Sequence, residues 1–369
     1  MGSIPQTIER LRALREQFGA MPQDGADGLL AELTDFGSNP GSLRALRFVP
    51  DDLAPGAALV VVLHGCTQTA TGYDHGSGWS RLAEEQGFAV LLPEQQRANN
   101  PNLCFNWFAA ADARRDRGEA LSIVQMVAAM VRQHGIDPAR IFVTGLSAGG
   151  AMTAVMLATY PELFAGGAVI AGLPYGTAWS VQDALTRMRG QGVPRSAELA
   201  DLVTNASTHD GRWPTISIWH GDADTTVAPA NAEALVAQWR SLHGIDSIAP
   251  ETQTSAGHQR RAWRDRDGRD VVEAYIVRGM GHGTPLKTGG DDGCGASGPY
   301  MLDVGLSSTR LIATGWGLID PSARKSQATS TGSAGQPGED RLPFHMPVHL
   351  PAGVERTIKD ALRTAGLLR

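Results

Sequence analysis

The sequence predicts an α/β fold built on a mostly parallel, doubly wound β-sheet with helices on both faces. The first observation is a series of short apolar runs rich in Val and Ile, which is typical of buried strands. The second is that helical patterns separate several of these runs, notably at 119–133 and 231–243. Strands that alternate with helices form parallel sheets covered on both faces. The predicted strands are RALRFVP, AALVVVLHG, FAVLLPE, IFVTGLS, GGAVIAG, TISIWHG and VEAYIVRG.

The chain of 369 residues divides into four predicted segments. Residues 1–43 are expected to form an amphipathic helix and a linker, because apolar residues recur at helical spacing between charges. Residues 44–320 form the α/β domain, in which 174–213 are predicted to be a small cap insertion over the strand ends. Residues 321–345 are rich in Ser, Thr, Gly and Pro and predict a flexible loop, and 346–369 predict a closing helix that packs on the domain.

Composition excludes several classes of partner. The net charge of −6 is spread without a basic stripe, so we expect no binding to nucleic acid. The sequence contains no run of about 18 apolar residues, so we expect no membrane span. It also shows no apolar leader, which predicts a cytoplasmic location. The three cysteines are too few for a disulfide scaffold and are not spaced as a zinc site.

A single serine, Ser147, lies between glycines in TGLSAGG, directly after the predicted strand IFVTG. The pentapeptide fits G-x-S-x-G, and the helical pattern that follows ends before Pro161. In this strand–turn–helix context the turn forces strained backbone angles on the serine, and small residues two positions away let the strand and the helix approach. The pattern therefore predicts a nucleophile rather than a packed turn.

A nucleophilic serine needs a histidine base and an acid that orients this histidine. In the chain the acid follows the serine first, and the histidine follows the acid. Asp224 is the predicted acid, because it lies deep in the loop after TISIWHG, whereas Asp222 would instead cap the turn. His282 is the predicted base, since it follows a strand late in the chain between glycines. His64 and His220 also end strands, and for both we expect the ring to hydrogen-bond loop backbone.

The remaining parts of an acyl-transfer site can be assigned only by position. Backbone N–H groups usually hold the negative charge that develops on a carbonyl oxygen. We expect these groups from Ala148 and from Cys66, with Thr67 as the alternative to Cys66. Trp107 is predicted to be a wall of the substrate pocket. This chemistry requires no metal and no organic cofactor.

Several longer stretches carry a family resemblance: LHGCTQTATGYDHGSGWSRLAEEQGFAVLLPEQ, CFNWF, GLSAGGAMTAVMLATYPELFAGGAVIAGLPYG, WHGDADTTVAPANAEAL and GMGHGTPL. The chain resembles the polyhydroxybutyrate depolymerase family of α/β-hydrolase esterases over roughly residues 44–317. The resemblance implies a serine esterase that cleaves short-chain hydroxyalkanoate esters through an acyl-enzyme, with Ser147, Asp224 and His282 as the triad. Secreted members carry a leader and often a polymer-binding module. Neither is seen here, which favours soluble oligomers or small esters as substrates.

Three questions stay open at the level of the sequence. Cys66 and Cys104 fall within the likeness and form either a disulfide that pins the oxyanion loop or two buried free thiols. The ester is either of the 3-hydroxybutyrate type or a feruloyl or acetyl ester of plant origin, as for relatives of the family. From another class, a non-catalytic binding protein on the same fold is the alternative, because fold does not determine function. Nothing indicates the oligomeric state.

Overall fold

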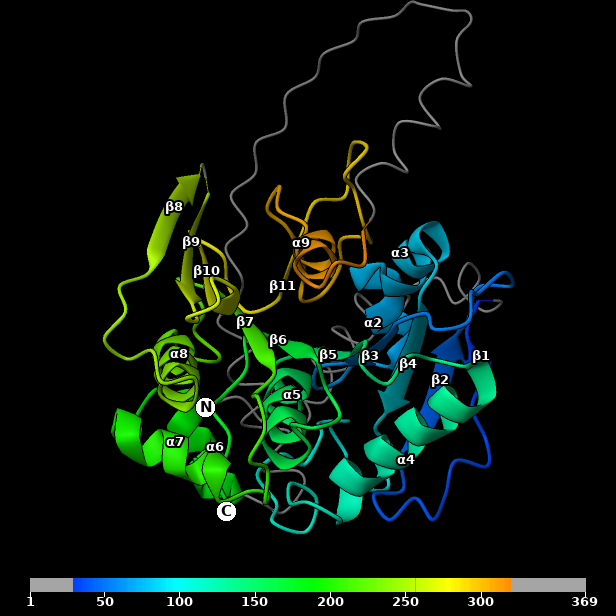
Figure 1. Cartoon of the computed structure of the whole chain (residues 1–369), viewed down its shortest axis with the longest axis horizontal. Helices are drawn as coiled ribbons and strands as arrows, with labels where there is room; N and C mark the ends of the chain where they lie inside the picture. The colour runs from blue at the N-terminus through cyan, green and yellow to red at the C-terminus, as the bar shows by residue number, and fades with distance from the viewer. Residues whose placement is uncertain (1–28, 256, 320–369) are drawn as a thin grey trace, which may run out of the picture.

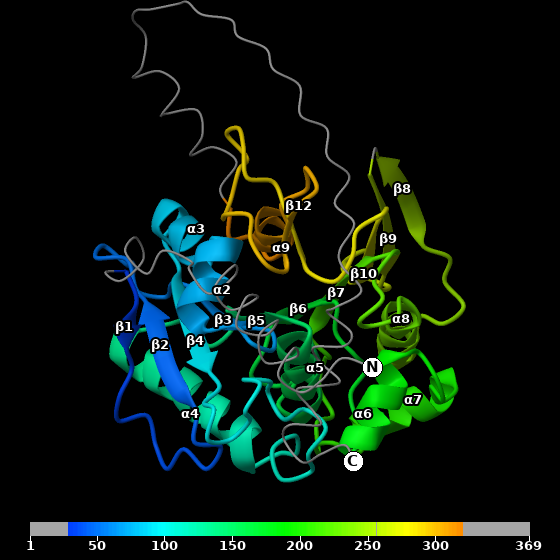
Figure 2. The same cartoon turned by 180° about the vertical axis from the view of Figure 1, so that it is seen from behind.

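A β-sheet forms the centre of the protein, and helices cover both of its faces (Figures 1 and 2). The computed structural model describes residues 29–255 and 257–319. Within these residues the sheet has ten strands in the order β1-β2-β4-β3-β5-β6-β7-β10-β9-β8. The strands are β1 (Ala31–Glu32), β2 (Arg44–Phe48), β3 (Leu59–Leu63), β4 (Ala89–Glu94), β5 (Ile141–Leu146), β6 (Gly166–Ile170), β7 (Thr215–Gly221), β8 (Glu251–Ser255), β9 (His258–Arg264) and β10 (Asp270–Val277).

The middle of the sheet is parallel. Strands β4, β3, β5, β6, β7 and β10 run in one direction, whereas β1 and β2 at one edge and β9 and β8 at the other pair in antiparallel fashion. Strands β3, β5 and β6 are buried along their whole length, because both faces of the sheet are covered. All seven strands expected from the sequence are present, as β2 to β7 and β10, which confirms the predicted fold class.

The helices form two layers. Helices α4, α5, α6, α7 and α8 lie on one face of the sheet, and α2, α3 and α9 lie on the other (Figure 1). Val61 and Val60 of β3 belong to two separate hydrophobic clusters, because successive side chains of a strand point to opposite faces. The helices are α2 (Ala70–Ser77), α3 (Trp79–Gln86), α4 (Gly118–His134), α5 (Ala148–Thr159), α6 (Val181–Met188), α7 (Ser196–Thr204), α8 (Ala230–Leu242) and α9 (Ser308–Gly315).

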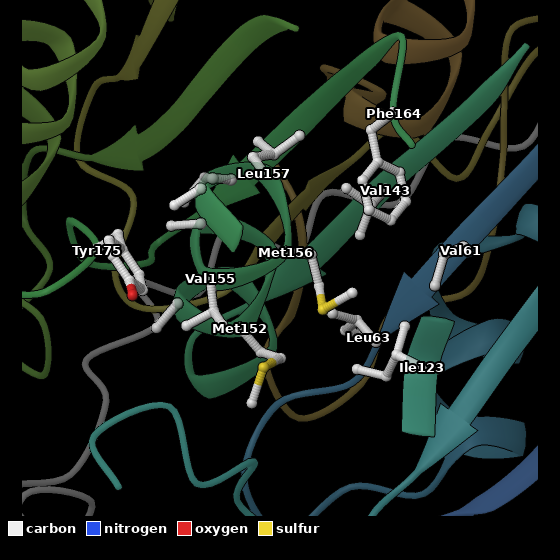
Figure 3. Packing of buried hydrophobic residues seen from close by; sticks show 14 of the residues in the cluster. Val61, Leu63, Ile123, Val143, Met152, Val155, Met156, Leu157, Phe164 and Tyr175 are labelled. Carbon is white, nitrogen blue, oxygen red and sulfur yellow. The ribbon is translucent and has the colours of Figure 1, made fainter. Parts of the chain in front are cut away.

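Helix α5, which follows the predicted nucleophile, is buried over all of its 12 residues. Figure 3 shows Met156 packed among Leu63 and Ile123, which come from β3 and α4. The hydroxyls of Thr153 and Thr159 donate to carbonyl oxygens four residues earlier, at 2.9 and 2.7 Å, so these buried polar groups are satisfied within the helix. Close packing on all sides therefore holds the start of α5 in one place.

Several elements differ from the sequence expectation or lie beyond it. Strand β1 pairs with β2, so part of the predicted linker joins the sheet. Strand β8 and the separate pair β11 (Thr284–Leu286) and β12 (Met301–Asp303) are too short or too polar to show a strand pattern. The predicted N-terminal helix, the loop at 321–345 and the helix at 346–369 fall outside the described residues. No helix in the described part of the chain is long and apolar enough to cross a membrane.

We predict that Gly149→Ala strongly destabilises the fold. An added Cβ would overlap the Leu63 carbonyl oxygen and lie 2.5 Å from the His64 carbonyl oxygen, and neither backbone group can move away cheaply. The cost is expected to be at least about 2 kcal/mol of unfolding free energy. Urea denaturation measures it, with Gly289→Ala as the control, because nothing lies within 4 Å of a Cβ there. Equal stability of the two variants would contradict this account of the turn.

Candidate active site

Ser147 occupies a sharp turn between β5 and α5. Its φ of 58° and ψ of −115° lie in a region that residues other than glycine rarely adopt. The turn is tight because a Cβ at Gly145 would lie 2.5 Å from the backbone of Gly149. The Ser147 N–H donates to the Ile170 carbonyl oxygen at 2.9 Å, which ties the turn to β6. The structure thus has the geometry that the G-x-S-x-G pattern predicts.

Asp224 lies in the loop after β7 and is buried. Its Oδ1 accepts backbone hydrogen bonds from Thr226 at 2.8 Å and from Val227 at 2.9 Å. Val227 is fully buried and anchors the loop against the core, as expected from the sequence. The carboxylate is therefore held from one side by the backbone of its own loop, and its second oxygen remains available to another group.

His282 lies in the loop after β10, and its Nδ1 is 2.7 Å from Asp224 Oδ2. Because the carboxylate accepts, Nδ1 carries the hydrogen, and Nε2 is left as the basic nitrogen. His282 and Ser147 line the same cavity, so the structure brings together all three residues predicted to form a triad. Asp222 has a different task, because its exposed carboxylate accepts from the Gly279 N–H at 2.6 Å and links the two loops.

The electrostatics of the pair favour a charged Asp224. Burial by itself would raise the pKa of this carboxyl group. The attraction of His282 and the hydrogen bonds from His220 and His282 outweigh burial, and together they hold the pKa of Asp224 well below its usual value. The carboxylate consequently stays ionised over the whole pH range in which a histidine titrates.

The predicted oxyanion donors line the cavity next to Ser147. Cys66 and Ala148 both line it, and within the described residues neither backbone N–H has a hydrogen-bond partner. Ala148 begins α5, so its N–H also lies at the positive end of the helix dipole. The alternative donor, Thr67, is wrong, because its N–H donates to the Asn102 carbonyl oxygen at 2.7 Å. That bond joins the loop after β3 to the segment after β4.

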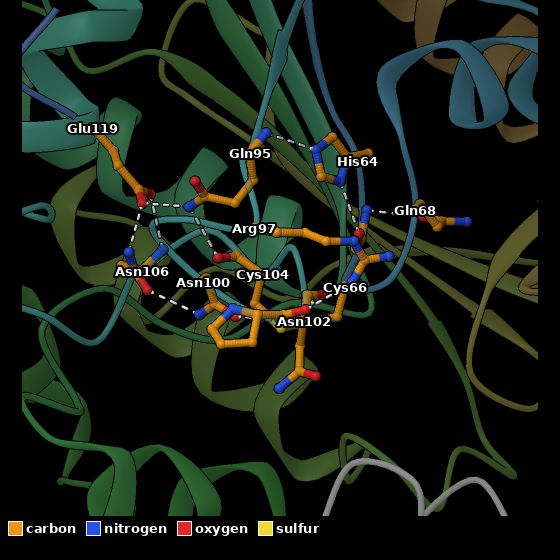
Figure 4. Close-up of a disulfide and its surroundings, with 12 residues drawn as sticks. His64, Cys66, Gln68, Gln95, Arg97, Asn100, Asn102, Cys104, Asn106 and Glu119 are labelled. Carbon is orange, nitrogen blue, oxygen red and sulfur yellow. Dashed lines mark hydrogen bonds between the residues drawn. A yellow bond between two sulfur atoms is a disulfide. The ribbon is translucent and has the colours of Figure 1, made fainter. Parts of the chain in front are cut away.

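Cys66 and Cys104 form a disulfide, which answers one of the questions left open by the sequence (Figure 4). The bond joins the loop after β3 to the loop after β4. Glu119 of α4 lies behind it and accepts from Gln95 at 2.5 Å and from Asn106 at 2.8 Å. Burial and a neighbouring carboxylate raise the pKa of Glu119 to about 8, against the opposing effect of these hydrogen bonds. Gln95 also donates to the Cys104 carbonyl oxygen at 3.1 Å, so hydrogen bonds connect the disulfide loop to Glu119 of α4.

The disulfide bears on the predicted location. Stable disulfides are typical of oxidising compartments, and the cytoplasmic location expected from the sequence stays a prediction. The third cysteine, Cys294, is a buried free thiol on the other face of the sheet, and burial raises its pKa to about 11. It takes no part in the cavity around Ser147.

His64 behaves as expected for a strand-end histidine. Its Nδ1 lies 2.8 Å from the Gly65 carbonyl oxygen, and its Nε2 accepts from the Gln95 N–H at 3.1 Å. A backbone N–H can only donate, so Nε2 is the acceptor and Nδ1 carries the hydrogen. Burial lowers the pKa of His64, in keeping with a neutral ring. The ring supports the peptide that leads into Cys66.

The cavity around Ser147 is mainly apolar. Trp107 is buried and lines it, as predicted, with Phe108 packed edge-on against its ring. Tyr300 lines it beside His282, with ring centroids 6.0 Å apart, and sequence reasoning missed this residue because it follows no recognisable motif. One side comes from the predicted cap segment, where helix α6 contributes four apolar residues: Val181, Ala184, Leu185 and Met188.

Comparison with known proteins shows that the chain is similar to esterases of one family. The family model described as esterase PHB depolymerase matches residues 44–265. The chain is 47% identical to poly(3-hydroxyalkanoate) depolymerase C of Paucimonas lemoignei over 79% of this chain and 70% of that protein. It is 30% identical to feruloyl esterase B of Talaromyces funiculosus, covering 69% of this chain and 73% of that protein. The structure of an acetyl xylan esterase from Aspergillus awamori is similar, with a TM-score of 0.68 and 28% identity over 79% of this chain and 100% of that one.

The chain thus combines a strained serine and a buried carboxylate–imidazole pair on a parallel sheet. Its sequence is also similar to esterases of one family. This similarity runs over most of the chain and includes the regions that carry Ser147 and Asp224. The protein is a carboxylic ester hydrolase with an α/β-hydrolase fold, and the chain belongs to the esterase PHB (polyhydroxybutyrate) depolymerase family.

Proposed function

We propose that the protein hydrolyses short-chain hydroxyalkanoate esters or oligomers, of the 3-hydroxybutyrate type, through an acyl-enzyme formed on Ser147. The observation that carries this proposal is the 2.7 Å hydrogen bond between Asp224 and His282 beside the cavity that Ser147 also lines. A binding protein would have no use for a buried ion pair arranged next to a strained serine. The similarity to a poly(3-hydroxyalkanoate) depolymerase supports the choice of ester.

The mechanism follows from the hydrogen bond between Asp224 and His282 and from the cavity that His282 shares with Ser147. Ser147 Oγ attacks the ester carbonyl while His282 Nε2 takes its proton and then passes it to the leaving alkoxide, which departs as the alcohol. In the second half, His282 removes a proton from water, the hydroxide attacks the acyl-enzyme, and the proton returns to Ser147 Oγ. Asp224 keeps Nδ1 of the imidazole protonated and stabilises the imidazolium in both halves.

Charge on the carbonyl oxygen has to be held during both attacks. We assign this task to the N–H groups of Cys66 and Ala148, helped by the N-terminus of α5. Trp107 and helix α6 provide an apolar wall for the acyl chain. The aromatic wall also suits a feruloyl or acetyl ester, and the similarity to feruloyl and acetyl xylan esterases keeps that substrate class as the second candidate.

We expect Ser147→Ala to abolish ester hydrolysis, with kcat reduced by about 10⁴-fold or more, because the variant lacks the hydroxyl that forms the acyl-enzyme. The assay is product release from soluble 3-hydroxybutyrate oligomers, with methyl ferulate and an acetylated xylo-oligosaccharide run in parallel. Release of 3-hydroxybutyrate by the wild type alone supports the proposal. Hydrolysis of only the plant-type esters would move the substrate to the second candidate, and full activity of the variant would exclude Ser147 as the nucleophile.

The pH dependence follows from the charge state of the pair. Asp224 stays ionised because its pKa is lowered, so the acid limb of the profile reports on His282, which must be neutral to act as a base. We expect kcat/KM for a soluble ester to fall about tenfold per pH unit below the range in which a histidine takes up a proton, about 6 to 7. A rate that is flat from pH 5 to pH 8 would contradict a histidine base.

Removal of the disulfide should reduce both turnover and stability. In Cys104→Ser the loop that carries the Cys66 N–H loses its covalent tie, and we expect kcat to fall about tenfold to a hundredfold with little change in KM, less than complete loss of an oxyanion donor costs. The closed loop of 38 residues predicts a loss of about 3 to 4 kcal/mol of unfolding free energy. Cys294→Ser is the control, and an equal effect on kcat in both variants would refute a role for the bridge.

A further inference from the structure

A second histidine lies next to the buried carboxylate. His220 is on β7 and is 0% exposed. Its Nε2 is 2.8 Å from the Val227 carbonyl oxygen and 3.4 Å from Asp224 Oδ2, the same oxygen that binds His282. The ring therefore contacts the loop that carries the acid at two points, Asp224 and Val227.

The tautomer of His220 follows from these partners. The Val227 carbonyl oxygen can only accept, so Nε2 carries the hydrogen, and the same nitrogen lies 3.4 Å from Asp224 Oδ2, close enough for the N–H dipole to act on the carboxylate. The other ring nitrogen, Nδ1, is buried and has no partner among the described residues. A buried nitrogen without a partner costs stability, which offsets what the bonded one contributes. An apolar side chain would fill this place in the core without that cost, so stability alone does not account for the histidine.

Asp224 is surrounded by donors. Two backbone N–H groups donate to Oδ1, the imidazole of His282 donates to Oδ2, and Nε2 of His220 lies 3.4 Å from that same oxygen. The pair of imidazoles is asymmetric, because His282 opens onto the cavity whereas His220 is closed within the core. Only His282 can exchange protons with a substrate, and His220 is left to act on the carboxylate.

We propose that His220 is a positioning residue for Asp224: its Nε2–H holds Oδ2 in line with His282 and draws part of the negative charge away from that oxygen. The proposal rests on the proposed function, in which His282 is the base. With less charge on Oδ2, the imidazolium of His282 is stabilised less, so His282 releases its proton at a lower pH and is available as a base over a wider range.

Other groups that face His282 could also affect the protonation of its imidazole. The Asp224 carboxylate lies against Nδ1, the ring of Tyr300 packs across the imidazole, and Ser147 shares the cavity. Tyr300 is uncharged at neutral pH, and burial raises its pKa further. The field at His282 is thus dominated by Asp224, and a change at His220 acts through that carboxylate.

Two substitutions separate the Nε2–H from the bulk of the ring. His220→Gln places an amide N–H near the position of Nε2 and keeps the donor to Asp224. His220→Asn places its amide near Nδ1 and removes that donor. We expect His220→Asn to move the midpoint of the acid limb of kcat/KM upward by about half to one pH unit, and His220→Gln to restore most of the wild-type midpoint. A purely structural role would lower the rate at every pH without moving the midpoint.

The outcomes are distinguishable. An unmoved midpoint in folded His220→Asn, together with an inactive Ser147→Ala, would overturn the role of His220 and leave the proposed function intact. If Ser147→Ala were active, the proposed function itself would fail. Should His220→Asn not fold, ¹⁵N NMR of the imidazoles in the wild-type protein decides the matter. A neutral His220 with hydrogen on Nε2 is expected, and hydrogen on Nδ1 would overturn the proposal.

Discussion

The structure depends on one steric constraint, the close approach of three backbones at the turn that carries Ser147. The strand β5, the start of α5 and the end of β3 meet where Gly145 and Gly149 leave no room for a Cβ. This contact sets the strained backbone of Ser147, and it also places the end of β3, and with it Cys66, directly beside the serine. The nucleophile and one proposed oxyanion donor are therefore positioned by a single packing arrangement.

The other groups reach the site on loops, and each of these loops is held by a bond to a neighbour. Asp222 links the loop of Asp224 to the loop of His282. The Cys66–Cys104 disulfide links the loop after β3 to the segment after β4. Loops carry function because they can vary, but a catalytic arrangement tolerates little movement. Cross-links between loops reconcile these demands, and the proposed role of His220 extends the same principle to the buried side of Asp224.

The family and the geometry point to the same chemistry from independent directions. Family membership identifies an ester hydrolase, and the hydrogen bond from His282 to Asp224 explains how the hydrogen is kept on Nδ1 and Nε2 is left as the basic nitrogen. The apolar cavity between Trp107 and α6 favours an apolar acyl group.

The sequence by itself determined the α/β fold, the parallel strands and Ser147, because each of these depends on local patterns: short apolar runs, helical periodicity and the small residues of a tight turn. It also indicated His282 by its place after a strand, and Trp107 as an aromatic side chain that could line an apolar ester pocket. Only the tertiary structure decided between Asp222 and Asp224, removed Thr67 as an oxyanion donor, formed the Cys66–Cys104 disulfide and brought Tyr300 to the cavity. These outcomes depend on contacts between segments far apart in the chain, such as Asp224 and His282 with a sequence separation of 58, and no local pattern records such contacts.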